Sequence, residues 1–354
     1  MDGGVRVIGW VLVLVLAAVA ALTLDPEWLG RVNDDWAGLT TTYPVNQVIA
    51  LRPLLAGVFA VSAIIVLVVG VVRKVGFHGG NRTLVLGLVL AAVAVGHGWF
   101  LWDRGLDNRA ELTADPGLRP DDPGDGSLTV LSYNTRDGDT GVDDIAAAAE
   151  TNGVDVLVLT ETSAELADQV AAFLAGGGES FQVFTAAAGE DVTGATAVLV
   201  SSSLGEYVQT TGPATELGAV RVEPATGVGP VVVGVHVVPP ASDNTDRWLR
   251  DLRAVRGLCT DRGPAGLVLA GDLNATLDHA PLQDLGRCTA AAVDGGVGGI
   301  ATWPARLPSL IGSTIDHVLV DGDSFETTEA LVVDRGDSDH RGLVVRVRPV
   351  DQTS

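Results

Sequence analysis

Residues 128–162 read LTVLSYNTRDGDTGVDDIAAAAETNGVDVLVLTET, in which two apolar runs enclose an alanine-rich stretch. The runs at 128–133 and 154–160 have the length and composition of buried β-strands. Between them, 142–153 predicts a helix, because acidic residues occupy its first turn and Gly153 stands at its end. This strand–helix–strand order indicates an α/β domain in which helices cover a sheet.

The same alternation continues toward the end of the chain. Further apolar runs predict strands, and two stretches between them predict helices. The strands are expected at 181–185, 195–200, 218–223, 231–237, 266–270, 314–320, 328–333 and 342–348, and the helices at 243–260 and near 280–287. We therefore expect one α/β domain over 128–348, followed by a tail at 349–354.

Polar side chains repeatedly stand where these apolar runs end. They are carboxylates, amides and imidazoles, the groups that bind metal ions and phosphate. The residues are Asn134, Glu161, His236, Asp272, Asn274, Asp316, Asp339 and His340. Because sites are commonly built from loops at strand ends, these eight residues predict a single site.

Their chemistry suits hydrolysis of a phosphate ester, which needs neutralised phosphoryl charge and an activated water. Mg²⁺, or Mn²⁺ in its place, neutralises that charge and prefers oxygen ligands. Asn134 and Glu161 offer such ligands from adjacent strands, and Asp339 offers another. Asp272 and Asn274 are two residues apart and share a face at strand spacing, so that the carboxylate activates water while the amide donates to phosphate.

Two histidines extend this chemistry. His236 and His340 can donate to the phosphoryl oxygens or protonate a leaving group. Asp316 beside His340 would favour the charged imidazole and hold its tautomer. Each short motif alone is weak evidence, since an Asp-x-Asn is commonly a turn and an Asp-His pair is commonly on the surface. Their order along the chain carries the prediction.

Residues 128–348 resemble the endonuclease/exonuclease/phosphatase superfamily, the fold of pancreatic deoxyribonuclease and abasic-site endonucleases. The resemblance rests on SYN, LTET, the His236 strand, GDLNAT, TWPA with IDHVLV, and SDH, in that order. It implies a four-layer α/β/β/α sandwich and a Mg²⁺-dependent hydrolase of phosphodiesters or phosphomonoesters, either a nuclease or a phosphatase. It does not specify the substrate.

By that resemblance, three of the eight residues look like metal ligands and five like catalytic groups. The metal ligands are Asn134, Glu161 and Asp339. The catalytic groups are His236, which contacts phosphate, Asp272, which activates water, its phosphate-binding companion Asn274, and the pair Asp316 and His340. Because no position of this set is missing, the resemblance implies an active enzyme.

Four neighbouring residues are expected outside the site. His317 follows Asp316 and should point to the opposite face of its strand, toward packing. His279 opens a helix and is expected to cap it or to lie at the surface, and Tyr133 should pack beneath the site. Trp303 is expected in the core or at the rim, with stacking on a base as the alternative.

Three long apolar runs occupy the first hundred residues, at about 5–24, 54–72 and 83–102. Each has about 20 residues, the length that a helix needs to cross a bilayer. We expect three transmembrane helices, because polar stripes are almost absent from the runs. The alternatives are buried helices of a soluble domain and, for the first run, a cleaved signal peptide. The expected location is the plasma membrane, with the lipid bilayer as partner and no protein partner inferred.

Loop charges predict the orientation. The segment 73–82 carries three basic residues and no acid, which indicates the cytoplasmic side, whereas the 25–53 loop is acidic. With three spans, the α/β domain lies outside the cytoplasm. The Asp-, Gly- and Pro-rich linker 103–127 is expected to be a solvated tether. Cys259 and Cys288 suit that compartment, either joined in a disulfide or as buried thiols.

The charge of the chain bears on its substrate. Residues 101–354 hold 16 Lys/Arg against 39 Asp/Glu, whereas proteins that bind long nucleic acids usually present a basic face. A local patch of Arg247, Arg250, Arg253 and Arg256 would still allow nucleic acid. A nucleotide, a small phosphate ester or a lipid headgroup needs fewer cations.

Two other classes of function stay open. The first is a catalytically idle binding or signalling module on a membrane anchor, which would show no hydrolysis. The second is a membrane transport protein whose spans form the path, but three short spans with one histidine and no acid argue against it.

Overall fold

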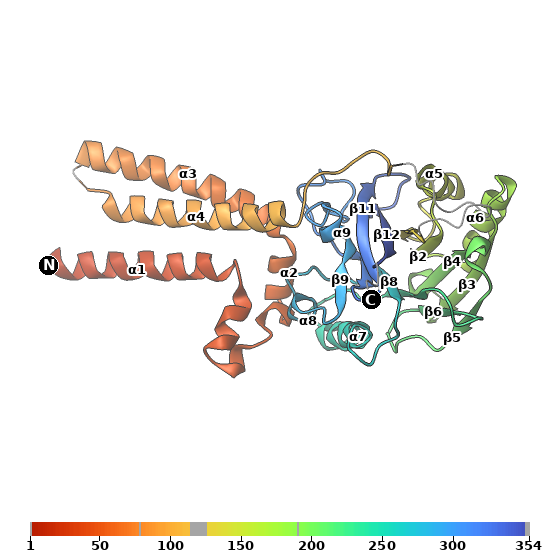
Figure 1. Cartoon of the computed structure of the whole chain (residues 1–354). Coiled ribbons are helices and arrows are strands. Elements are labelled where there is room, and N and C mark those ends of the chain that lie inside the picture. Colours follow the sequence, from red (N-terminus) through yellow and green to blue (C-terminus); the bar gives the residue numbers. More distant parts are fainter. Residues whose placement is uncertain (1, 78, 114–125, 190, 351–354) are drawn as a thin grey trace. The chain divides into compact units, whose positions relative to one another are not determined.

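The computed structural model describes residues 2–77, 79–113, 126–189 and 191–350. The chain divides into an N-terminal unit, Met1–Asp103, and a C-terminal unit, Arg104–Ser354 (Figure 1).

The N-terminal unit is helical. Its long helices are α1 (Asp2–Leu22), α3 (Arg52–Phe77) and α4 (Asn81–Asp103). Between α1 and α3 lie η1 (Pro26–Arg31), η2 (Asp34–Trp36), η3 (Leu39–Thr41) and α2 (Val45–Ala50). Helix α4 packs along α3, and Gly87 allows the close approach, because a Cβ at this position would lie 2.7 Å from Leu67 Cγ.

Helices α3 and α4 are long and apolar enough to cross a membrane, by length and composition. In α1 the apolar stretch among the described side chains is Val7–Leu22, which is shorter than that length. Of the three predicted transmembrane helices, the part of the chain that the structure describes therefore supports two as candidate spans.

The C-terminal unit contains two six-stranded sheets. The first has the order β11-β12-β1-β2-β4-β3, and the second has the order β5-β6-β7-β8-β10-β9. The strands of the first are β1 (Leu128–Asn134), β2 (Val156–Thr160), β3 (Phe181–Ala187), β4 (Ala195–Ser201), β11 (Phe325–Val333) and β12 (Gly342–Pro349). Those of the second are β5 (Tyr207–Thr210), β6 (Ala219–Pro224), β7 (Val231–His236), β8 (Leu267–Asp272), β9 (Cys288–Ala290) and β10 (Asp316–Asp321).

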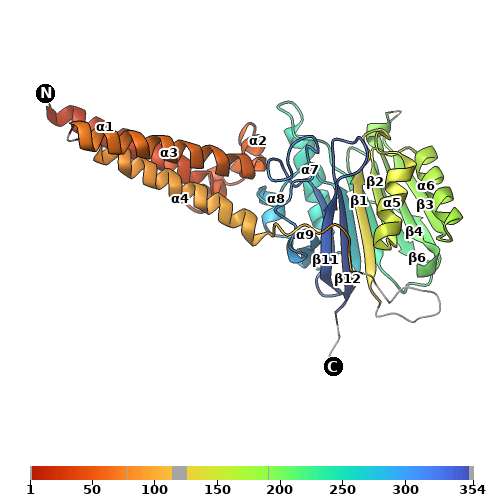
Figure 2. The ribbon, with the colours of Figure 1, turned by 90° about the horizontal axis from the view of Figure 1, so that it is seen from above.

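The sheets pack face to face, and helices cover their outer faces (Figure 2). Buried side chains from both sheets, among them Val158 and Val232, form the core between them. The first sheet is covered by α5 (Val142–Asn152) and α6 (Ala164–Gly176), and the second by α7 (Thr245–Gly257). The shorter elements are η4 (Val192–Gly194), η5 (Ser202–Leu204), α8 (Ala280–Gln283) and α9 (Ala291–Asp294). The predicted α/β class, with two sheets and flanking helices, is confirmed.

Residues 104–113, which we call the strap, lie against the C-terminal unit. Arg104 makes a two-bonded ion pair with Asp278, at 2.6 and 3.0 Å. The side chain of Asn108 exchanges hydrogen bonds of 2.9 and 2.8 Å with the backbone of Val332 in β11. Leu112 is buried in the core beneath α5. The expectation of a solvated tether is therefore wrong for these residues, because their side chains find specific partners; positions 114–125 lie outside the described residues.

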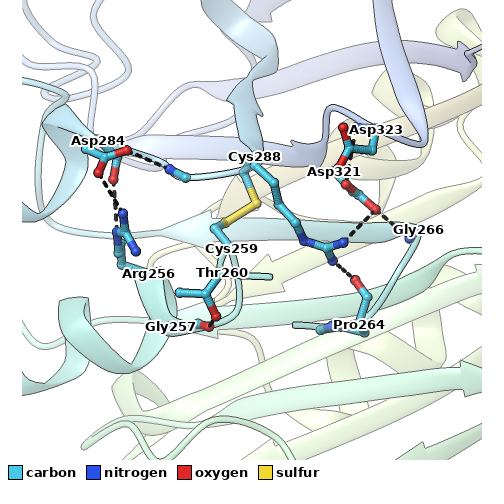
Figure 3. The surroundings of a disulfide bond; sticks show 12 residues. Arg256, Gly257, Cys259, Thr260, Pro264, Gly266, Asp284, Cys288, Asp321 and Asp323 are labelled. Atoms are coloured by element: carbon cyan, nitrogen blue, oxygen red, sulfur yellow. Dashed lines mark hydrogen bonds and ion pairs between the residues drawn. A yellow bond between two sulfur atoms is a disulfide. The ribbon is translucent and has the colours of Figure 1, made fainter. Parts of the chain in front are cut away.

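A disulfide joins Cys259, just after α7, to Cys288 at the start of β9 (Figure 3). The alternative of two free thiols is thus excluded. Beside it, Arg256 pairs with Asp284 at 2.9 Å, so a second link ties the end of α7 to the segment before β9.

Candidate functional site

Strand pairing brings the predicted residues to one end of the two sheets. Asp272, the last residue of β8, pairs in register with His236 of β7 and with Asp316 of β10. In the first sheet, Asn134 ends β1 opposite Thr160, and Glu161 follows directly. Because the sheets pack face to face, these ends meet.

The backbone at the glycine of GDLN leaves no room for a side chain. Gly271 has a φ of +140°, and a Cβ at this position would lie 1.9 Å from the carbonyl oxygen of Val235. Only glycine therefore allows β8 to pass β7 just before Asp272.

Asn134 links the two sheets at the site. Its Nδ2 donates to Glu161 Oε1 at 3.0 Å and to Asp272 Oδ2 at 3.1 Å. Both Asn134 and Asp272 are buried, whereas the side chain of Glu161 is 20% exposed. Two carboxylates thus converge on one amide, with an opening to solvent at Glu161.

His236 faces the same two carboxylates. Its Nε2 lies 3.8 Å from Glu161 Oε1 and 3.7 Å from Asp272 Oδ2. Its Nδ1 lies 2.9 Å from the carbonyl oxygen of Thr193. Since a carbonyl oxygen only accepts, Nδ1 carries a proton and Nε2 is the atom that is presented to the site.

On the other side of Asp272 stands the Asp-His pair. His340 Nδ1 bonds Asp316 Oδ2 at 2.9 Å, and His340 Nε2 lies 3.7 Å from Asp272 Oδ2. Within the described residues, Asp316 Oδ1 is buried and has no hydrogen-bond partner. The three residues offer ligand atoms that all lie within 4.8 Å of one another.

Burial and charge shift the pKa values of this group. Burial raises the pKa of Asp272, the charge of Asp316 raises it further, and the two histidines oppose this, so that it stands at about 6. Burial alone would lower the pKa of His340, but the charges of Asp316 and Asp272 and the bond to Asp316 raise it to about 10. At neutral pH the site therefore holds a carboxylate able to take a proton beside an imidazolium able to give one.

Two of the predicted residues have left-handed backbones. Glu161 has a φ of 51° and Asn274 a φ of 47°. The backbone N–H of Asn274 donates to Asp272 Oδ1 at 2.8 Å, and its Nδ2 donates to the carbonyl oxygen of Val237 at 2.9 Å. Asn274 thus orients the Asp272 carboxylate. Non-glycine residues with a left-handed backbone, such as Glu161 and Asn274, are commonly found at functional sites.

Asp339 stands beside this network. Its Oδ2 accepts from Trp303 Nε1 at 3.1 Å, and its Oδ1 lies 3.6 Å from Arg136 Nε. The structure thus joins Asn134, Glu161, His236, Asp272, Asn274, Asp316 and His340 directly, and places Asp339 at the rim with Trp303 and Arg136.

Two supporting residues were missed by the sequence analysis. Ser338 Oγ donates to the carbonyl oxygen of Asn134 at 2.7 Å and accepts from the N–H of His340 at 3.1 Å. Thr302 Oγ1 accepts from the N–H of Asp316 at 3.2 Å. Both belong to the SDH and TWPA motifs, so their motif membership was the available signal.

The residues that we expected outside the network lie outside it. His317 Nε2 bonds the carbonyl of Ala275 at 2.8 Å, and burial lowers the pKa of His317. The Tyr133 hydroxyl donates to the carbonyl of Arg335, beneath the site, and His279 Nδ1 accepts from the N–H of Thr276. The packing roles expected of His317 and Tyr133 are confirmed, whereas the surface position expected of His279 is wrong, because its side chain is 1% exposed.

The donor set fits a hard divalent cation. The carboxylates of Glu161, Asp272 and Asp316 converge, and buried carboxylates need compensating charge. Asp316 Oδ1 is a buried oxygen that no described hydrogen bond satisfies. Oxygen-rich, negatively charged surroundings of this kind suit Mg²⁺ or Mn²⁺.

Comparisons with known proteins show which family the chain resembles. The model of the Endonuclease/Exonuclease/phosphatase family matches residues 131–340. The human Nocturnin catalytic domain with bound sulfate is 16% identical, with a TM-score of 0.46, over 64% of this chain and 94% of that chain. D. rerio TDP2 complexed with single-strand DNA product is 16% identical, with a TM-score of 0.48, over 63% and 99%. A family protein from Bacteroides thetaiotaomicron is 16% identical, with a TM-score of 0.48, over 64% and 96%. No curated protein matches the chain.

Proposed function

The chain belongs to the Endonuclease/Exonuclease/phosphatase family, and we propose that it is a membrane-anchored, divalent-metal-dependent hydrolase of phosphate esters. One observation carries the proposal. Asp272, buried where the two sheets meet, bonds Asn134 and lies 3.7 Å from the Nε2 atoms of both His236 and His340. Its raised pKa suits a base that takes a proton from the attacking water.

We propose Asn134 and Glu161 as ligands of Mg²⁺, with Mn²⁺ as substitute. Asp339 would join them through Oδ1, since its Oδ2 accepts from Trp303. Asp272, Asp316 and His340 are the alternative set, and there the buried Asp316 Oδ1 has no hydrogen-bond partner among the described residues. When bound, the cation neutralises phosphoryl charge and stabilises the leaving oxygen.

The remaining residues move protons and hold the phosphate. Asp272 orients and deprotonates water. His340, charged and held by Asp316, donates to a phosphoryl or leaving oxygen. His236 presents Nε2 to the same region, and Asn274 holds Asp272 through its backbone N–H.

Charge argues against long nucleic acid as the substrate. Arg247 and Arg250 of α7 lie 3.1 and 3.9 Å from the carboxylate of Glu216, and Arg256 pairs with Asp284. Most of the expected arginine patch is thus neutralised by neighbouring acids. Nucleotides, small phosphate esters and lipid headgroups remain as candidate substrates. If the substrate is not that of a nuclease or a phosphatase, the alternative is the phosphodiester of a lipid headgroup.

We propose the plasma membrane as location, with the C-terminal unit outside the cytoplasm. The basic segment 73–82 and the apolar helices α3 and α4 support the anchoring. The disulfide supports an oxidising compartment. A reporter that is active only outside the cytoplasm should be active when it is fused to the C-terminus. Activity of a reporter that works only inside the cytoplasm would refute this orientation.

A catalytically idle binding module is the competing class. The test is a screen of the detergent-solubilised full chain with Mg²⁺ or Mn²⁺ against nucleic acids, nucleotides, phosphoinositides and sphingomyelin. Asp272→Asn should abolish any turnover, and exposed Asp261→Asn serves as a matched control that retains it. Absence of turnover with every metal and substrate would refute the hydrolase and favour the idle module.

A further inference from the structure

Residues 303–313, which we call the apolar arch, form a closed loop beside the site. Its base is closed by a bridge, in which the N–H of Trp303 donates to Ser313 O at 3.0 Å and the N–H of Ser313 donates back at 2.7 Å. Two turns shape the loop, since Leu307 N–H bonds Pro304 O and Ile311 N–H bonds Pro308 O. The arch therefore has a defined backbone.

A buried arginine braces the arch from below. Arg341 donates to the carbonyl oxygens of Ala301, Ala305 and Leu307, at 3.2, 2.5 and 2.6 Å. Its Nε donates to Asp334 at 2.8 Å. A charged group that satisfies two carbonyls of the arch and one just before it holds the loop in one conformation, so the side chains at its tip are held exposed.

That tip is apolar. Leu307, Leu310 and Ile311 are 41%, 56% and 43% exposed. In the rest of the C-terminal unit, as far as the structure describes it, the large exposed apolar side chains stand singly, which is ordinary for a protein surface. The arch carries Arg306 and no acid, in a unit that is strongly acidic. Three aliphatic side chains and one cation on a rigid loop suit insertion among lipids.

The arch is also continuous with the site. The N–H of Ala305 donates to the carbonyl oxygen of Asp339 at 2.7 Å, and Trp303 Nε1 donates to the Asp339 carboxylate. Arg341, which braces the arch, directly follows His340. An amphiphile whose chains contact the tip would thus have its headgroup near the polar strand ends.

We propose that the apolar arch binds a lipid surface and that the substrate is the phosphate ester of a lipid headgroup. This rests on the proposed hydrolase for the chemistry, but not for the contact with lipid. Lipid is favoured over a protein partner because the tip carries aliphatic rather than aromatic side chains and because the same chain holds helices α3 and α4. It is favoured over nucleic acid because the arch offers a single cation.

The contact is tested without reference to activity. Both native cysteines are in the disulfide, so Leu310→Cys in the full chain gives one thiol for an environment-sensitive fluorophore. In phosphatidylcholine nanodiscs, the label should shift to the blue and be quenched by spin-labelled lipid. Val228→Cys is the control, since Val228 is 79% exposed and lies before β7, at the end opposite His236. Equal emission and quenching at the two positions would overturn the lipid contact.

The substrate class is tested by selectivity. Replacing Leu307, Leu310 and Ile311 together by Ser should lower hydrolysis of a phospholipid by about tenfold or more, because their burial in lipid is lost. Hydrolysis of the soluble ester bis(p-nitrophenyl) phosphate should change less than about twofold, and Val228→Ser should change neither rate. An equal fall for both substrates, or retained phospholipid hydrolysis, would overturn the proposal. If wild type hydrolysed neither ester, the hydrolase itself would fail, while the fluorophore result would still decide the lipid contact.

Discussion

Arg104→Gln should destabilise the C-terminal unit, whereas Arg109→Gln in the same strap should not. Arg104 and Asp278 are joined by two hydrogen bonds, and their side chains are only 18% and 5% exposed. Arg109 also pairs with a carboxylate, that of Glu329, but its side chain is 57% exposed. The two substitutions therefore remove the same chemistry from a buried and from a solvated position.

The magnitudes follow from that burial. Breaking a fully buried pair costs about 3–5 kcal/mol, and because Arg104 keeps some contact with water we expect about 2–3 kcal/mol. For the solvated pair of Arg109 we expect less than about 1 kcal/mol. In a unit of this size the first loss corresponds to a fall of about 4–12 °C in Tm.

The assay is pulse proteolysis of the detergent-solubilised full chain in a urea series, which reports the free energy of unfolding of the C-terminal unit. A double-mutant cycle with Asp278→Asn isolates the pair. If Arg104→Gln cost as much in the Asp278→Asn background as in wild type, the ion pair would not be the cause. Equal losses for Arg104→Gln and Arg109→Gln would refute the argument from burial.

Four further predictions concern the site and the disulfide. Because the pKa of Asp272 is raised to about 6, its base form is lost below that pH, and the rate should fall about tenfold per pH unit there; a flat pH–rate profile would contradict this. Asp316→Asn removes the charge that opposes the effect of burial on His340, so the alkaline limb should move to lower pH, and an unmoved limb would exclude His340 as the acid. EDTA should abolish hydrolysis and Mg²⁺ should restore it, with the circular dichroism spectrum unchanged; full activity in EDTA would refute the metal. Cys259→Ser and Cys288→Ser should each lower the free energy of unfolding by about 3 kcal/mol, and reduced wild type should match them; stability equal to that of oxidised wild type would contradict the expected contribution of the disulfide.

Much of the site was predictable because strands deliver side chains in fixed register. Asp272 follows a buried apolar run, and its neighbours in the sheet are His236 and Asp316, which end or begin runs of their own. Local pattern placed each of these three residues at a strand end, and the order of the motifs along the chain indicated that they form one site. The role of Thr193 was not predictable, because a backbone carbonyl has no sequence signature.

The strap and the apolar arch were beyond a reading of local composition. The partners of Arg104 and Asn108 lie 174 and 224 residues away, and an Asp-, Gly- and Pro-rich stretch looks solvated until those partners are known. The apolar residues of the arch are few and interrupted by Pro308, so they show no period that separates a loop tip from a core strand.

The bonds between Asn108 and Val332 have a consequence for solubility. β11 is the edge strand of its sheet, and an open edge offers unpaired N–H and C=O groups to any other strand. Asn108 occupies both backbone groups of Val332 with a side chain that cannot itself extend a sheet. The strap thereby blocks part of the edge where a second copy of the chain would otherwise add a strand, and a fragment that starts after the strap would expose it to aggregation.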